Sequence, residues 1–129
     1  MLDIIKNDEF TNHLGIEFSE LNKETAVARI PFSAKLCNPY GSLHGGVLYS
    51  IADIVCGTLA CTSGYYCTTV EGSMQYLNPA VNTAYIICNA RITKSGSHMV
   101  FVTCDLTTAE GVLIDSGSFV FFKTNIPAK

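Results

Sequence analysis

A short stretch of the chain contains the residue types that chemistry at a carbonyl group requires. Residues 38–53 read "NPYGSLHGGVLYSIAD" and include an amide, an imidazole, two adjacent glycines and one carboxylate. The carboxylate, Asp53, is the only charge in a run of apolar and small residues from position 45 to 62. A lone acid in such a run needs either a structural partner or a chemical role.

The two glycines, Gly45 and Gly46, open a segment whose length favours a helix over residues 45–62. The first amides of a helix have no intrahelical acceptor and lie at the positive end of the helix dipole. Glycine has no Cβ, so a ligand can approach these amides closely. A carbonyl oxygen gaining negative charge would be stabilised there by about 3 kcal/mol per donor. We therefore expect an oxyanion hole at Gly45, with tight packing of the helix start as the alternative.

Asp53 lies eight residues after Gly45, which corresponds to about 12 Å along a helix axis. One chain cannot place both groups at the same reacting carbon. Two such helices packed antiparallel across a two-fold axis would bring Asp53 of one chain close to Gly45 of the other. The spacing therefore predicts a homo-oligomer with composite sites, in which Asp53 is a general base or a nucleophile. The alternative is a structural carboxylate bonded to backbone amides or to Ser50.

His44 and Asn38 are expected to shape the glycine end of this site. His44 directly precedes the glycines, which favours a positioning role over a role as the base. Asn38 either orients a carbonyl or a water with its amide, or is a turn residue before Pro39. The three histidines lie apart from acids in the sequence and show no ligand spacing, so we predict no metal site.

The segments before and after residues 38–53 predict the fold that positions these groups. A short amphipathic helix is expected over residues 2–14, ended by Gly15. The helix over 45–62 is apolar on every side and is expected to be buried on every side. Strands are expected over 16–21, 25–32, 68–77, 84–94, 98–107 and 112–123, separated by turn residues. An antiparallel sheet curled around one central helix satisfies this order. We predict an α+β fold in a single domain over residues 1–129.

The composition and charge of the chain limit the binding partners that we expect. Hydrophobic residues make up 48% of the 129 residues and charged residues only 15%, an excess that burial in an oligomer would relieve. The net charge of −3 comes without a run of Lys or Arg, so neither nucleic acid nor a membrane surface is an expected partner. The first residues are interrupted by acids, unlike a secretory signal, and apolar runs fall short of the roughly 20 residues of a membrane span. We expect a cytoplasmic protein.

The cysteines are expected to be small core residues rather than ligands or disulfide partners. No C-x-x-C pair occurs, and most cysteines have aliphatic or Thr neighbours. They stand at positions 37, 56, 61, 67, 88 and 104.

The stretch "NPYGSLHGGVLYSIAD" resembles the motif of the hotdog-fold acyl-CoA thioesterases of the PaaI-like family. The resemblance extends to "HLGIEF" before it and to "VEGSMQYLNPA" and "ARITKSGSHMVFVTCDLTTAEGVLIDSGSFVF" after it, so that it covers nearly the whole chain. It implies a helix wrapped by five or six antiparallel strands, dimers joined by a continuous sheet, and often tetramers. It also implies hydrolysis of an acyl-CoA thioester, with no cofactor beyond the coenzyme A of the substrate.

The resemblance assigns roles to individual residues. The Gly45 amide would polarise the thioester carbonyl with Gly46 beside it, Asn38 and His44 would shape that end, and Asp53 of the partner chain would activate water or attack the acyl carbon. A hydroxyl after the helix would help to hold the water. The matching residue is Thr69, or Thr68 if the alignment shifts by one.

The coenzyme A phosphates imply basic groups near the mouth of the site. Arg91 and Lys94 are candidates, beside the turn formed by Ser95, Gly96 and Ser97. Many relatives have a basic residue where this chain has Ser97, so phosphate binding is expected to be weaker or to use other groups, and an acyl-carrier-protein substrate stays open. The nature of the acyl group is open as well. Two other functions are alternatives to thioester hydrolysis. One is a non-catalytic acyl-CoA-binding module, and the other is an acyl-thioester hydratase or dehydratase.

Overall fold

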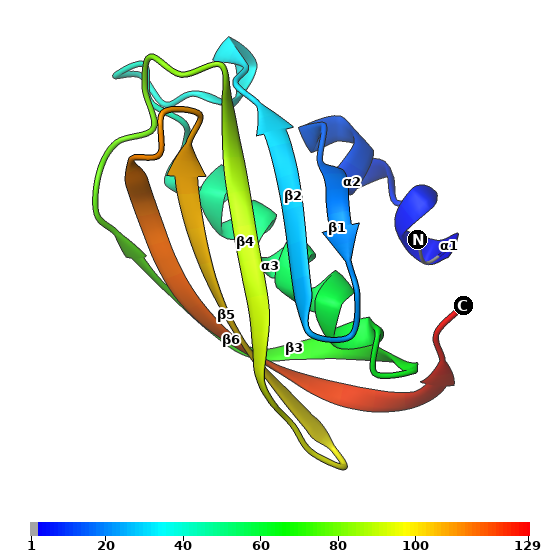
Figure 1. The fold of residues 1–129 in the computed structure, drawn as a ribbon. Helices are drawn as coiled ribbons and strands as arrows, with labels where there is room; N and C mark the ends of the chain where they lie inside the picture. Colours follow the sequence, from blue (N-terminus) through cyan, green and yellow to red (C-terminus); the bar gives the residue numbers. More distant parts are fainter. Residues whose placement is uncertain (1–2) are drawn as a thin grey trace.

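One six-stranded antiparallel sheet and one long helix dominate the computed structural model, which describes residues 3–129. The sheet order is β1-β2-β4-β5-β6-β3, and every neighbouring pair is antiparallel. Figure 1 shows the sheet curving around α3, which confirms the expected hotdog arrangement. The elements are α1 (Asp3–Lys6), α2 (Glu9–Leu14), β1 (Glu17–Leu21), β2 (Thr25–Pro31), a 3-10 helix (Ala34–Leu36), α3 (Gly45–Cys61), β3 (Tyr65–Tyr76), β4 (Tyr85–Ser95), β5 (Met99–Thr108) and β6 (Leu113–Pro127).

The helix α3 begins and ends where the sequence predicts, but its expected burial on every side is wrong. His44 is its N-cap and Thr62 its C-cap. The sheet covers only part of the helix surface, because one curved layer cannot enclose a cylinder. Several residues of the helix are left partly or fully exposed, and four of them form a stripe along it: Gly46, Ser50, Asp53 and Gly57. Asp53 is therefore half-buried rather than fully buried.

The N-terminal segment contains two short helices, and the single helix expected over residues 2–14 is wrong. Position 2 lies outside the described residues. The break falls at Asp8, whose carboxylate caps α2 by accepting a hydrogen bond from the Thr11 amide. A capping carboxylate needs extended backbone, so the helix cannot run through it. Gly15 ends α2 in the left-handed conformation, as expected.

The strand β3 is longer than expected and forms one edge of the sheet. It begins at Tyr65 instead of residue 68, because it pairs with the C-terminal end of β6 as far as Pro127. β6 is its neighbour on one side, and its other edge has no strand partner within residues 3–129. Much of β3 is exposed, including Val70.

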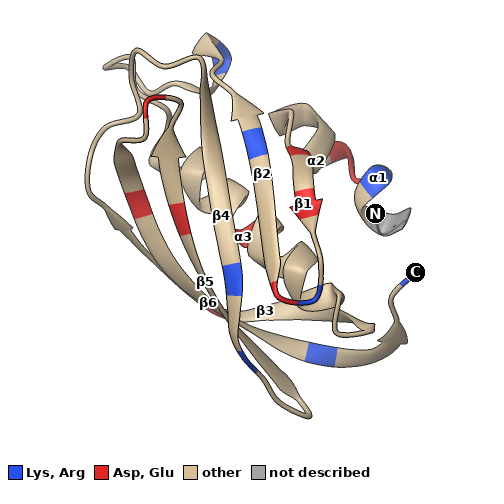
Figure 2. Ribbon diagram, viewed as in Figure 1, with Lys and Arg blue, Asp and Glu red and all other residues tan. Residues whose placement is uncertain are grey.

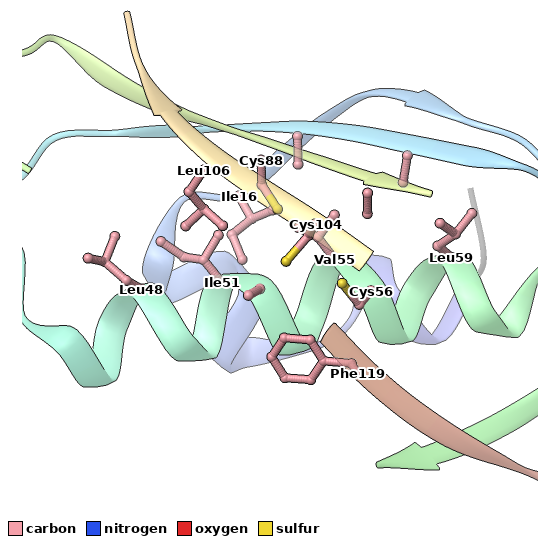
Figure 3. Packing of buried hydrophobic residues seen from close by; sticks show 14 of the residues in the cluster. Ile16, Leu48, Ile51, Val55, Cys56, Leu59, Cys88, Cys104, Leu106 and Phe119 are labelled. Carbon is pink, nitrogen blue, oxygen red and sulfur yellow. The ribbon is translucent and has the colours of Figure 1, made fainter. Parts of the chain in front are cut away.

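The core lies between α3 and the concave face of the sheet. Alternate residues of each strand point toward the helix, for example Ala26, Ala28 and Ile30 in β2. Figure 3 shows the thiols of Cys56, Cys88 and Cys104 among aliphatic side chains. These three and Cys61 are buried, as expected of small apolar residues, while Cys37 and Cys67 are half-buried. None of the helices in residues 3–129 is both long and apolar enough to cross a membrane.

Candidate active site

The structure joins Asp53 on α3 to Thr69 on β3. The Thr69 hydroxyl donates a hydrogen bond of 2.7 Å to Asp53 Oδ1. The strand register explains the choice of threonine. Thr69 pairs with the buried Phe121 and therefore faces the helix, whereas Thr68 pairs with the exposed Phe122 on the outer face. The alternative based on Thr68 is not supported, because its side chain points away from Asp53.

Asp53 and Thr69 open onto a cavity of about 700 Å³, which we call the Asp53 cavity. One wall is formed by Asp53, Gly57 and Cys61 of α3, which are spaced about one helical turn apart. Its lining contains two carboxylates and no basic side chain among the described residues. The full lining is Ile5, Asn7, Asp8, Asp53, Ile54, Gly57, Thr58, Cys61, Tyr66, Cys67, Thr69 and Phe121.

The glycine end of α3 is held by two side chains. His44 Nδ1 accepts a hydrogen bond of 3.3 Å from the Gly46 amide, so the imidazole caps the helix. The Tyr76 hydroxyl donates a 2.9 Å hydrogen bond to the Gly45 carbonyl oxygen, and the ring lies against the space that a Gly45 Cβ would occupy. As the first residue of the helix, Gly45 has an amide without an intrahelical acceptor.

Asn38 organises the loop that precedes the helix. Its Oδ1 accepts hydrogen bonds from the Tyr40 amide at 2.9 Å and the Ser42 amide at 3.2 Å. Its Nδ2 donates to Ser42 Oγ at 2.8 Å. These bonds are those of a turn residue, and they hold the backbone beside Gly45 in place. Asn38 also lines a cavity there, so the turn role and a ligand contact are compatible.

The two ends of the motif open onto different cavities in one chain. Gly45 lines a cavity of about 280 Å³, the Gly45 cavity, together with Asn38, Leu48 and Tyr76. No residue of its lining also lines the Asp53 cavity. Within a single chain, the candidate oxyanion donor and the candidate base therefore face separate spaces.

The predicted phosphate contacts lie away from the Asp53 cavity of the same chain. Arg91 is exposed on the outer face of the sheet, in a cleft it shares with Glu20 and Asp105. Lys94 is also exposed, and Figure 2 shows basic residues spread over separate elements. The turn of Ser95, Gly96 and Ser97 forms the tip of the β4–β5 hairpin, which projects from the sheet in Figure 1.

A basic residue that the sequence did not single out lies at this turn. Lys123 Nζ donates a hydrogen bond of 2.7 Å to the Gly96 carbonyl oxygen. Ser97, His98 and Lys123 line a cavity of about 600 Å³ beside Tyr65. Gly96 and Lys123 are 27 positions apart, which hides this proximity in the sequence. No three potential metal ligands of the His, Cys, Asp or Glu type come together in the described part of the chain.

Asp115 is a buried acid that the sequence did not reveal. It is 0% exposed, and neither carboxylate oxygen has a hydrogen-bond partner. Desolvation by burial, with a smaller contribution from Cys104, raises the pKa of Asp115 to about 7. It pairs across the sheet with Tyr76, whose pKa is raised chiefly by burial and next by Asp115. The alternation of β6 could have indicated its inward position, since it shares a face with Phe119.

Comparison with known proteins gives matches in sequence and structure. The family model described as "Thioesterase superfamily" matches residues 40–114. A Saccharolobus solfataricus protein with an esterase name is 28% identical over 128 residues, covering 96% of this chain and 91% of its own. Acyl-coenzyme A thioesterase PaaI of Escherichia coli is 24% identical over 91 residues, or 70% of this chain and 65% of that protein.

Solved structures share the fold. The Escherichia coli PaaI structure superposes with a TM-score of 0.92 at 18% identity, covering 96% of this chain and 90% of the other. A Streptococcus pneumoniae thioesterase protein with coenzyme A superposes with a TM-score of 0.81 at 22% identity, covering 84% and 85% of the two chains.

Proposed function

This chain belongs to the thioesterase superfamily and is a thioester hydrolase, and we propose that its substrate is an acyl-CoA, which it converts to the free acid and coenzyme A. The observation that carries the proposal is the Asp53–Thr69 pair at the wall of the Asp53 cavity. A carboxylate held by one hydroxyl keeps its second oxygen available for a ligand. A water molecule bound there would be oriented for attack on a carbonyl carbon.

The chemistry follows from these groups. Asp53 takes a proton from water while the water oxygen attacks the thioester carbonyl carbon. The carbonyl oxygen gains negative charge and is stabilised by the Gly45 amide of a second subunit. The tetrahedral intermediate then collapses, the carbon–sulfur bond breaks, and the departing thiolate recovers a proton from Asp53. Direct attack by the Asp53 carboxylate would give an anhydride that water hydrolyses, with the same products.

A site shared between two subunits is supported by the separation of the two cavities and by the free edge of β3. Gly45 and Asp53 face different spaces in one chain. A long exposed edge strand offers unpaired backbone groups to another strand. Two-fold pairing along β3 would build a continuous sheet and place the two α3 helices antiparallel, each presenting its Asp53 toward the partner's glycine end.

The polarity of the Asp53 cavity indicates which end of the substrate it receives. Its charged lining is acidic, which suits an uncharged acyl group and disfavours phosphates. The phosphates of coenzyme A would instead need cationic groups, and Lys123 beside the Ser97 turn is a candidate in addition to Lys94 and Arg91. An acyl-carrier-protein thioester would share the acyl end and differ only in these outer contacts.

The test is hydrolysis across a panel of short, medium and aromatic acyl-CoA thioesters. Purified protein is expected to release free thiol and free acid in equal amounts, with one acyl class preferred. Binding without thiol release across the panel would favour the acyl-CoA-binding alternative. Addition or loss of water in an enoyl or hydroxyacyl thioester would favour the hydratase alternative.

A further inference from the structure

The Asp53 cavity extends along α3 from the candidate base toward the C-terminal end of the helix. Asp53, Gly57 and Cys61 all line it, and each lies four residues after the one before. Exposure decreases along this path. Thr69 beside Asp53 is exposed, Gly57 is half-buried, and Cys61 is only 7% exposed. The cavity is therefore open beside the carboxylate, and its α3 wall becomes buried away from it.

The lining beyond the Asp53–Thr69 pair presents mostly apolar surface. The Thr58 hydroxyl donates to the carbonyl oxygen four residues earlier in α3, at 2.7 Å. The Cys67 thiol donates to the carbonyl oxygen two residues earlier in β3, at 3.4 Å. Both donors are therefore used within their own elements and are not free for a ligand. Apolar side chains of the lining are Ile5, Ile54 and Phe121.

The charge of the lining excludes one kind of acyl group. The charged residues that line the cavity, Asp8 and Asp53, are both acids. The Asp8 carboxylate accepts a hydrogen bond of 3.2 Å from the Thr11 amide as the N-cap of α2, which favours its charged form. An acyl group that carries its own carboxylate would be repelled by both acids. The cavity therefore suits a neutral acyl group.

Gly57 keeps the middle of the cavity open. A Cβ at this position would lie 3.2 Å from Phe121 Cε1, so the aromatic ring packs directly against the helix backbone. A glycine inside a helix is destabilising relative to alanine. Here it leaves room that any larger side chain would take from the Phe121 ring or from the cavity.

The length of the α3 wall limits the length of the group that it can cover. Asp53 and Cys61 are separated by about 12 Å along the helix axis. An extended carbon chain advances about 1.3 Å per bond, because a carbon–carbon bond is about 1.5 Å long. When about 4 Å is left for the van der Waals contact at the end, about eight carbons fit, counted from a carbonyl carbon beside Asp53.

We propose that the Asp53 cavity selects a neutral, straight-chain acyl group of about eight carbons, and that Cys61 limits its length. This proposal rests on the proposed function, because it places the thioester carbonyl carbon beside Asp53. A shorter aromatic acyl group, such as benzoyl, leaves the apolar surface near Cys61 uncovered. A longer chain meets the buried end of the cavity and has to bend or leave its tail in water.

The experiment measures kcat/KM for straight-chain thioesters from acetyl-CoA to lauroyl-CoA, together with benzoyl-CoA and phenylacetyl-CoA. Each methylene that enters the cavity should raise kcat/KM about fourfold, the equivalent of burying one such group. The rise should stop at about octanoyl-CoA, where the α3 wall ends. A continued rise to lauroyl-CoA, or a preference for an aromatic thioester over octanoyl-CoA, overturns the proposal.

Two variants change the cavity, and one serves as a control. Cys61 lies outside the core cluster of the described residues, so the larger side chain of Cys61→Leu would enter the cavity. The ratio of kcat/KM for octanoyl-CoA to that for butyryl-CoA should fall at least about tenfold, as expected when two methylenes lose their contacts. Ile5→Ala, on the peripheral helix α1, should lower this ratio about threefold. Cys37→Leu adds the same bulk at a half-buried cysteine outside this cavity and should leave the ratio unchanged.

An unchanged ratio in folded Cys61→Leu and Ile5→Ala variants overturns the assignment of the cavity. Binding of S-alkyl coenzyme A thioethers, which cannot be hydrolysed, separates this assignment from the proposed function. By calorimetry, affinity should rise with alkyl length up to about S-octyl-coenzyme A, and Cys61→Leu should weaken the longer thioethers most. If no acyl-CoA is hydrolysed, the proposed function fails, while this length dependence still decides the cavity. Equal affinity for all thioethers overturns the proposal even in an active enzyme.

Discussion

The Thr69 hydroxyl donates a hydrogen bond of 2.7 Å to Asp53 Oδ1, joining the edge strand of the sheet to the middle of the central helix. The bond connects residues that are sixteen positions apart. It holds one oxygen of a carboxylate that lines the Asp53 cavity. An acid on a partly exposed helix face is thereby held in one orientation, which a general base requires.

Replacement of Asp53 tests the base directly. Asp53→Asn keeps the size of the side chain and its ability to accept from Thr69, but it removes the proton acceptor. The turnover number is expected to fall by at least about 100-fold, the low end for a positioned acid or base. The measurement is steady-state hydrolysis with circular dichroism as the control for folding. Unchanged turnover in a folded variant would contradict the mechanism.

Replacement of Thr69 tests the orientation of the carboxylate. Thr69→Val keeps the shape and removes the donor, so kcat should fall about tenfold, the equivalent of one hydrogen bond to a charged group. Thr69→Ser should retain most of the activity. Thr68→Val is the matched control, because its side chain lies on the opposite face of the same strand. Equal losses from both valine variants would indicate a general effect on β3 instead.

Mixed oligomers test the shared site. Gly45→Pro removes one amide at the first helical position, where proline fits and no helix hydrogen bond is lost. The preceding His44 already has the extended backbone that proline requires, with φ −61° and ψ 138°. Co-expression of Gly45→Pro with Asp53→Ala chains should restore about a quarter of wild-type activity, since half of random dimers are mixed and each has one intact site. Absence of rescue in verified mixed dimers would exclude the composite site.

The Tyr76 hydroxyl is expected to act as a positioning group for the start of α3. Tyr76→Phe removes the bond to the Gly45 carbonyl oxygen and keeps the ring that lies over Gly45. We expect kcat to fall about three- to tenfold, in the range of one neutral hydrogen bond, with KM unchanged. Tyr85→Phe, which removes a hydroxyl on β4 that lines neither the Asp53 cavity nor the Gly45 cavity, should have no effect. A rise in KM alone would assign Tyr76 to substrate binding.

Asp115 should make stability depend on pH. Its pKa in the folded protein is about 7, above its ordinary value of 3.8. Between these values the native state binds more protons than the unfolded state, so this residue's contribution to the free energy of unfolding decreases as pH rises, by at most about 1.4 kcal/mol per pH unit. Asp115→Asn should remove that slope. Urea denaturation of both proteins from about pH 4.5 to 8 measures it, and parallel curves would refute the assignment.

Much of the scaffold could be predicted from local patterns. The apolar run after Gly45, the turn dipeptides and the alternation within strands determine α3 and six strands in the observed order. The predicted element boundaries that were wrong depend on contacts with other residues, which a local pattern does not show. β3 extends to Tyr65 because the far end of β6 pairs with it, and the first helix is broken because Asp8 caps α2.

The sequence by itself determined the candidate machinery at Gly45 and Asp53, since both lie on one helix and their separation follows from the helical rise. Only the tertiary structure decided which other groups meet them. Thr69 was distinguished from Thr68 by strand register, and Tyr76 reaches Gly45 because β3 runs back along α3. The register of β3 and its path along α3 depend on pairing between segments far apart in the chain. A shift of that register by one residue would have turned each of these side chains to the other face of the sheet.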